Sequence, residues 1–424
     1  MTMDVRRTIE ALWRMDAPRL IATLARQIGD VGVAEDLASE AFVAALEQWP
    51  AEGIPPRPGA WLMATARHKA IDRARREEAG RRKAALIAVE AQPYTPDVAD
   101  DLPDPISDDV LTLIFIACHP ILPREARVAL TLRLIGGLST DEIARAFLIP
   151  SATLGQRISR AKRTLSEAQV PFEPPGADKL PARVGAVLEV VYLIFNEGYS
   201  ASSGDGWVRR DLAQEAMRLG RVLAGLLPAE PEVSGLLALM ELHASRFATR
   251  AEPDGTPVLM DRQDRSRWDR ILIAHGLSML DRAAKLGRPL GPYAIQAAIA
   301  AHHSRARTFA ETDWAAVVAL YDALAQVAPS PIVDLNRAVA LLYTDGPEAA
   351  LAAIDAIRDD KRLARYHLLG AVRADILIRL GRAAEAAEEL EHAADLAPTR
   401  HERQLLRRRM ADALAGSPST GDAV

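Results

Sequence analysis

The stretch that most constrains the fold of this chain runs from Leu138 to Leu165, LSTDEIARAFLIPSATLGQRISRAKRTL. Ser139 and Glu142 have the S-x-x-E spacing of a capping box, in which each residue satisfies a backbone N–H of the other at the start of a helix. We predict a first short helix that ends at Phe147, a break at Pro150, and a second helix directly after it. This pattern predicts a helix-turn-helix.

The second helix of this pair has a narrow apolar face. Leu154, Ile158, Ala161 and Leu165 recur at i, i+4, i+7 and i+11, which places them on one side of a helix. The outward side chains combine groups that hydrogen-bond to base edges with cations that neutralise phosphates, as a recognition helix in a major groove requires. These residues are Ser151, Thr153, Gln156, Arg157, Arg160 and Arg163. An ordinary surface hairpin with a basic face is the alternative interpretation.

Composition favours helices throughout. The 424 residues leave room for two to four domains, and 49% of them are hydrophobic while only 5% are aromatic. Abundant Ala, Leu and Arg favour helix packing over sheets, so we predict an all-α protein. No apolar run reaches the ~20 residues of a membrane span, and the N-terminus lacks a signal-peptide core. We therefore expect a cytoplasmic protein with no membrane partner.

The sequence carries no signature of a metal site or of catalysis. Cys118 is the single cysteine, which excludes an internal disulfide and a thiolate cluster. The pair His302 and His303 and the scattered acids lack metal-ligand spacing. Phosphate-binding glycine loops, nucleophile elbows and paired catalytic carboxylates are absent from the pattern. We predict no catalytic residues, no metal, no cofactor and no enzymatic activity.

Charge is segregated along the chain, although the net charge is only -5. Nine Lys or Arg residues against three acids lie between Arg57 and Lys83, and eight bases against three acids lie between Arg124 and Arg163. Seven acids and no base lie between Glu90 and Asp109. A nucleic-acid interface is therefore expected only in the two basic blocks, which flank an acidic, proline-rich spacer.

Three further segments precede the helix-turn-helix. Residues 4–27 predict an amphipathic helix pair, and residues 33–49 predict a helix with acids near its start, where carboxylates favour the helix dipole. A loop from Pro50 to Pro58 contains four prolines and is predicted to be non-helical. A helix then begins near Ala60, with an apolar stripe opposed by cations.

This order of segments closely resembles an extracytoplasmic-function (group 4) sigma factor of bacterial RNA polymerase over about residues 5–166. The resemblance implies partners: the clamp coiled coil and the flap of core polymerase, and promoter DNA. It implies that the segment Ala34–Phe42 docks on the clamp, with Glu35, Asp36, Leu37, Glu40 and Phe42 as the contact residues. The linker would thread the polymerase cleft in such a factor.

The same resemblance implies how DNA is read. The Trp-Leu helix and the loop before it would open the −10 element, through Trp61, Arg67, His68, Lys69, Arg73, Arg75 and Arg76. The helix-turn-helix would read the −35 element through the six outward residues named above. Two departures stand out: Ser39 and Ala41 replace the usual Gln and Thr of the docking segment, and His68 stands where Asn is common. Trp61 is either a stacking platform for a base or a core residue.

The second half extends well beyond such factors. Ala-Leu-rich helices follow a proline-rich boundary, and Ala328-Pro329 and Ala397-Pro398 each close a helix, 398 − 329 = 69 residues apart. This distance is about twice the ~34-residue tetratricopeptide period, so we predict a tetratricopeptide-like solenoid whose concave face binds a peptide or another domain. A plain helical bundle is the alternative.

We therefore predict four segments: region 2 at residues 1–84, an acidic linker at 85–107, a region 4 helix-turn-helix at 108–168, and a C-terminal regulatory domain at 180–416. The predicted function is promoter-specific initiation by RNA polymerase, controlled by the C-terminal domain through an intramolecular or protein partner. The alternatives are a polymerase-independent helix-turn-helix regulator with a solenoid sensor, and a protein-binding scaffold.

Overall fold

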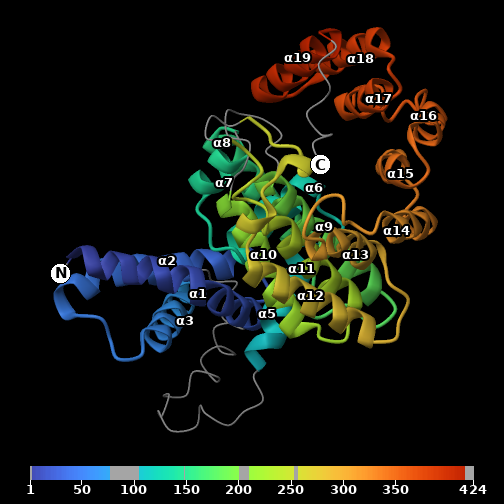
Figure 1. Ribbon diagram of the computed structural model, residues 1–424. Coiled ribbons are helices and arrows are strands. Elements are labelled where there is room, and N and C mark those ends of the chain that lie inside the picture. Colours follow the sequence, from blue (N-terminus) through green and yellow to red (C-terminus); the bar gives the residue numbers. More distant parts are fainter. Residues whose placement is uncertain (1, 77–104, 148, 200–209, 253–255, 416–424) are drawn as a thin grey trace. The chain divides into compact units, whose positions relative to one another are not determined.

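The computed structural model describes residues 2–76, 105–147, 149–199, 210–252 and 256–415. Within these residues the chain is helical, and its extended backbone pairing is one isolated bridge between Ala251 and Pro257. The predicted all-α class is confirmed. Two compact units divide the chain, residues 1–193 and residues 194–424 (Figure 1). Most of the acidic linker predicted at residues 85–107 lies outside the described residues, which leave out 77–104.

The N-terminal unit is built on two long helices that pack against each other along their apolar faces. Helix α1 packs against α2, and α3 packs on both. Ile21, Leu37 and Leu62 lie fully buried between the three helices. The helices of this unit are α1 (Thr2–Ile28), α2 (Val31–Glu52), α3 (Pro58–Arg76), α5 (Pro105–Ala117), α6 (Arg124–Leu134), α7 (Thr140–Ala146), α8 (Ser151–Glu167) and the first part of α9 (Leu180–Tyr199).

Two expectations about the first helices are wrong. Residues 4–27 form no helix pair but part of the single helix α1, which contains Pro18. Helix α2 likewise continues through Pro50 to Glu52, so the loop before α3 is shorter than predicted. A proline inside a helix costs about 3 kcal/mol. Burial outweighs this cost: Leu20, Ile21 and Leu24 follow Pro18 in the core, and the buried Trp49 precedes Pro50.

The predicted helix-turn-helix is present. The Ser139 backbone N–H donates to the Glu142 carboxylate at 2.8 Å, and the Glu142 N–H donates to Ser139 Oγ at 3.2 Å, which is the capping box. Helix α8 buries its predicted apolar face, Leu154, Ile158, Ala161 and Leu165. This face packs on α6 and α7, so the opposite face of α8 is held outward by burial rather than by local sequence.

The C-terminal unit begins with a bundle around α11. Helix α11 is buried on almost every side and packs against α10, α12 and α13. Its Glu241 is fully buried and accepts from Arg221 of α10 at 2.7 Å and contacts His275 of α12. The bundle comprises α10 (Arg210–Leu226), α11 (Pro231–Ala244), the short helices η2 (Met260–Arg262) and η3 (Arg265–Arg267), α12 (Arg270–Lys285) and α13 (Pro292–Arg305).

From α13 onward each helix packs on the next one along the chain, and α14 to α19 follow one another in an arc (Figure 1). Sequential contacts of this kind are the packing of a solenoid, as predicted. Arg373 of α17 fixes one turn of the arc because its guanidinium binds both Asp355 at 2.9 Å and Glu389 at 2.8 Å. The helices are α14 (Trp314–Val327), α15 (Pro331–Thr344), α16 (Pro347–Asp355), α17 (His367–Arg379), α18 (Ala383–Leu396) and α19 (Arg400–Leu414).

Close packing of α11 on α13 predicts that Gly235→Ala destabilises the bundle. A Cβ atom at Gly235 would lie 2.7 Å from the Cα of Ala294, a contact with backbone that a side-chain rotation cannot relieve. Overpacking of this kind costs about 1–3 kcal/mol. Hydrogen exchange of peptides from α11 and α13 should accelerate. Gly225→Ala in α10 is the matched control: its Cβ meets nothing within 4 Å, so exchange should be unchanged or slower. Equal exchange in both variants would contradict the packing argument.

Candidate functional site

Helix α8 presents the predicted −35 residues to solvent. Ser151, Thr153, Gln156, Arg160 and Arg163 are exposed, and Arg157 is half-buried. Arg163 is joined to Glu167 one turn later at 3.6 Å, an exposed pair that contributes little to stability. The face therefore carries amide and hydroxyl groups beside cations, which is the chemistry of a helix in a major groove.

Helix α3 carries the predicted −10 residues. His68 is exposed, while Arg67, Lys69 and Arg73 are half-buried. Lys69 pairs with Glu40 of α2 at 3.5 Å, so it links the two helices. Trp61 is half-buried, and its ring meets the buried Trp49 edge-on at 5.3 Å. One side of Trp61 thus packs on the core. The side chains of Arg75 and Arg76 lie outside the described part of the chain.

Helix α2 separates the predicted polymerase-docking residues into two groups. Leu37 and Phe42 are buried, and the Phe42 ring meets Trp13 of α1 edge-on at 4.9 Å. The side chains of Asp36 and Glu40 are 55% and 52% exposed. Glu35 is different from both groups, because it is only 3% exposed although it is charged.

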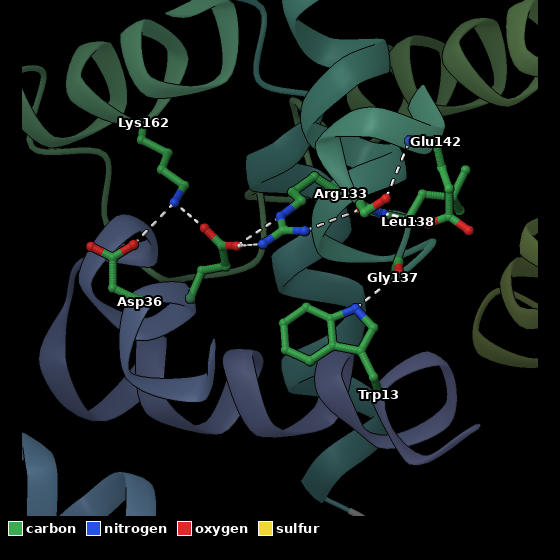
Figure 2. A network of polar contacts seen from close by, with 9 residues as sticks. Trp13, Asp36, Arg133, Gly137, Leu138, Glu142 and Lys162 are labelled. Atoms are coloured by element: carbon green, nitrogen blue, oxygen red, sulfur yellow. Dashed lines mark hydrogen bonds and ion pairs between the residues drawn. The ribbon is translucent and has the colours of Figure 1, made fainter. Parts of the chain in front are cut away.

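Glu35 binds cations of two helices that follow it by about a hundred residues. Arg133 of α6 donates from Nε and Nη2 to one carboxylate oxygen at 2.8 Å and 2.7 Å. Lys162 of α8 donates from Nζ to the other oxygen, and it also approaches Asp36 at 3.4 Å (Figure 2). Glu35, Asp36, Arg133 and Lys162 form what we call the Glu35 cluster. It joins the docking helix to the flank of the recognition helix.

Neighbouring contacts reinforce this joint. The Trp13 indole N–H donates to the Gly137 carbonyl at 2.8 Å, and the Arg133 guanidinium lies 5.5 Å from the centre of the Trp13 ring (Figure 2). Ser166, one turn after Lys162, donates to Asp30 at 2.7 Å, and Asp30 caps the start of α2. The contact between the first two helices and the helix-turn-helix is therefore a set of half-buried and exposed polar bonds.

The Glu35 carboxyl is ionised in this setting. Burial by itself raises the pKa of Glu35, but the charges of Lys162 and Arg133 and their hydrogen bonds outweigh it and hold the pKa below its ordinary value of 4.5. A buried carboxylate without these partners would cost several kcal/mol, so the cluster depends on both cations.

The sequence missed Arg133 and Lys162 as functional partners of Glu35. Lys162 falls between the buried and the outward faces of α8, and Arg133 lies in α6, for which no contact with Glu35 was predicted. The one signal in the sequence is the position of Glu35 in an amphipathic helix, because an acid that becomes buried there needs a cation as its partner. Nothing in the sequence indicates which of the distant cations it is.

Within the described residues, no helix is long and apolar enough to cross a membrane. The same residues contain no group of three or more His, Cys, Asp or Glu side chains arranged to hold a metal ion.

One helical domain carries exposed acids on α2 beside the basic helix α3, and the other carries a helix-turn-helix with a polar, basic outer face. This combination is typical of a DNA-binding protein of the sigma type. Comparison with known families agrees. Sigma-70 region 2 matches residues 12–80, and Sigma-70, region 4 matches residues 112–165. A family of unknown function (DUF6596) matches residues 183–284.

Two relatives support this assignment. An uncharacterized protein of Rhizobium meliloti (strain 1021) is 42% identical over 408 residues, 95% of each chain. A protein of Mycobacterium tuberculosis named "Probable ECF RNA polymerase sigma factor SigI" is 29% identical over 166 residues, 38% of this chain and 56% of that protein. No solved structure matches the chain. The chain belongs to the extracytoplasmic-function sigma factors that carry a long C-terminal extension.

The Glu35 cluster generates a prediction for Lys162→Met, which keeps the apolar stem and removes the charge. Glu35 then retains only Arg133, and the loss of a charge-assisted bond costs about 1–3 kcal/mol. Hydrogen exchange at the start of α2 should accelerate about tenfold or more. Lys179→Met, at an exposed lysine outside the cluster, is the matched control and should leave that exchange unchanged. Identical protection in both variants would exclude a stabilising role for Lys162.

Proposed function

We propose that this chain binds core RNA polymerase and directs promoter-specific transcription initiation, and that its C-terminal unit controls this activity. The observation that carries the proposal is the presence, in one compact unit, of an exposed acidic side of α2 beside α3 and a recognition helix with a polar, basic outer face. A free-standing operator-binding regulator requires only the last of these surfaces. Sigma factors catalyse no reaction themselves, and they act with polymerase in the cytoplasm.

The exposed side of α2 is the proposed docking surface for the polymerase clamp. Asp36 and Glu40 supply its charge, and Val43 and Leu46 are large apolar side chains that remain 52% and 44% exposed. Exposed apolar residues beside charges are typical of protein interfaces. Leu37 and Phe42 support this surface from the core, so we assign them a positioning role.

The Glu35 cluster suggests how docking is regulated. Any polymerase contact with Glu35 requires Lys162 and Arg133 to release it, since the carboxylate is buried between them. Replacing a buried ion pair by equally good contacts elsewhere changes the free energy little, whereas leaving the acid unpaired costs several kcal/mol. We propose that the polymerase supplies the replacement contacts and thereby separates α2 from α8.

Strand opening at the −10 element is assigned to α3 and the loop before it. A base that leaves the stack costs a few kcal/mol, and stacking on an aromatic ring returns about 1–3 kcal/mol. Trp61 packs on Trp49 with one side and is half-buried, which leaves part of its surface for a base. Arg67, His68, Lys69 and Arg73 are the proposed contacts to the backbone and neighbouring bases.

Control by the C-terminal unit has a physical route through α9. In the N-terminal unit, Arg183 of α9 donates to the carbonyl of Phe115 in α5. Glu189 of α9 pairs with Arg124 at 3.2 Å and with Arg127 at 3.7 Å, both in α6. Since α6 carries Arg133 and packs on α8, a displacement of α9 acts on the support of the recognition helix. The C-terminal unit is proposed to transmit the binding of a partner along this helix.

Run-off transcription with purified core polymerase tests the proposal. The template carries the promoter region of the chain's own operon, and the full chain is compared with a chain that ends at residue 193. The cut lies after the α9 contacts, because an earlier end would remove Arg183 and Glu189 from the N-terminal unit. We expect transcription from at least one form. A difference in transcript yield between the two forms measures how the C-terminal unit controls the activity. DNA binding without polymerase association in both forms would favour the free-standing regulator.

The recognition face predicts that Arg157→Ala and Arg160→Ala each weaken binding to the −35 element by about 1–3 kcal/mol. A lost phosphate contact also reduces the slope of log K against log salt by about one. Fluorescence anisotropy with duplex DNA at several salt concentrations measures both quantities. Arg307→Ala, at an exposed arginine of the C-terminal unit, is the control. Unaltered affinity and slope in both variants would remove these arginines from the interface.

A further inference from the structure

The C-terminal unit contains a cavity of about 540 Å³ on the inner side of its helical arc. Its lining comes from five helices, α13, α14, α15, α17 and α19. Leu259, the residue before η2, and Met260, the first residue of η2, also line it. Cavities that bind small molecules usually measure about 300–1,000 Å³. The cavity therefore suits a small molecule.

Aromatic rings gather in this cavity, although the whole chain is poor in them. Trp314 stacks on Tyr343 with ring centres 4.4 Å apart and 19° between the planes. Phe309 meets both rings edge-on, at 5.1 Å from Trp314 and 5.2 Å from Tyr343. The lining also includes the aliphatic side chains of Val372 and Ile378. A flat or narrow apolar group would be buried against these rings and aliphatic side chains.

One cation at this cavity lacks an acidic partner. Arg379 donates from Nη2 to the Tyr343 hydroxyl at 3.2 Å, and its guanidinium lies 5.2 Å from the centre of that ring. Among the residues that the structure describes, no carboxylate pairs with Arg379. Arg409 in the same lining is different, because it binds Asp375. A guanidinium beside an apolar wall is a typical site for a ligand carboxylate.

A second polar group also lacks a partner. His303 lies in the lining with its ring edge-on to Trp314 at 5.2 Å, and its Nδ1 is buried without a hydrogen-bond partner in the described structure. Burial, together with the charges of Arg246 and Arg265, lowers the pKa of His303 to about 3. The imidazole is therefore neutral at cellular pH. An unsatisfied buried nitrogen at a cavity wall is a feature that a bound polar atom would explain.

We propose that this cavity binds a small organic acid, whose aromatic or aliphatic body lies against Trp314 and Tyr343 and whose carboxylate pairs with Arg379. His303 hydrogen-bonds to a polar atom of the same ligand. This inference concerns the C-terminal unit alone and stands independently of polymerase or promoter binding.

Isothermal titration calorimetry of the full chain tests this site with probes of matched shape. The probes are 2-naphthoate, octanoate and the neutral alcohol 2-naphthalenemethanol. We expect one molecule of 2-naphthoate to bind per chain, and the alcohol to bind about tenfold more weakly because it lacks the charge. Saturable binding of neither acid at millimolar concentration, or equal affinity for 2-naphthoate and the alcohol, would overturn the proposal.

The variant Arg379→Gln tests whether the ligand carboxylate pairs with Arg379. It should weaken 2-naphthoate about tenfold and leave the alcohol unchanged, so that the preference for the acid disappears. The side chain is exposed, and a thermal melt equal to that of the native chain confirms that the variant is folded. Arg382→Gln is the matched control, since Arg382 lies three residues away and is paired with Glu385 at 2.6 Å. Equal weakening in both variants, or none in Arg379→Gln, would contradict the assignment.

Discussion

The N-terminal unit depends on one buried carboxylate. Glu35 is taken out of water between α2, α6 and α8, and Arg133 and Lys162 compensate this loss of hydration. Direct bonds from two cations hold its pKa low, so the acid stays charged where burial alone would neutralise it. Because each cation comes from a different helix of the second domain, a single acid joins the predicted docking helix to the predicted recognition helix.

This joint holds the predicted polymerase-docking helix and the predicted recognition helix in one compact unit. An apolar contact between the two domains would not depend on particular charged partners. A buried ion pair stabilises the contact only while every charge in it is paired. The Glu35 cluster is thus stable only while both cations bind the carboxylate. Helix α9 contacts the neighbouring helices α5 and α6 through Phe115, Arg124 and Arg127, and α6 also packs on α8.

The C-terminal unit combines two kinds of packing. Its first helices surround α11, where the buried Glu241 again joins three helices through Arg221 and His275. Its later helices pack in sequence, and their curvature leaves a concave side where Trp314, Tyr343 and Arg379 meet. Solenoids expose a large inner surface for their size because each helix contacts mainly its neighbours. Phe309, Trp314, Tyr321 and Tyr343 line the cavity on that side.

The sequence by itself determined what is local. Periodicity and capping chemistry depend on residues a few positions apart, so the capping box of Ser139, the buried face of α8 and the repeated helices of the second half were all predictable. The proline rule was less reliable for the loop from Pro50 to Pro58, since burial of Trp49 outweighs the local backbone cost of continuing α2 through Pro50. Only the tertiary structure decided the partners of Glu35 and the contacts of Tyr343 with Trp314 and Arg379, because these contacts join distant residues through the packing of helices, and no local spacing encodes them.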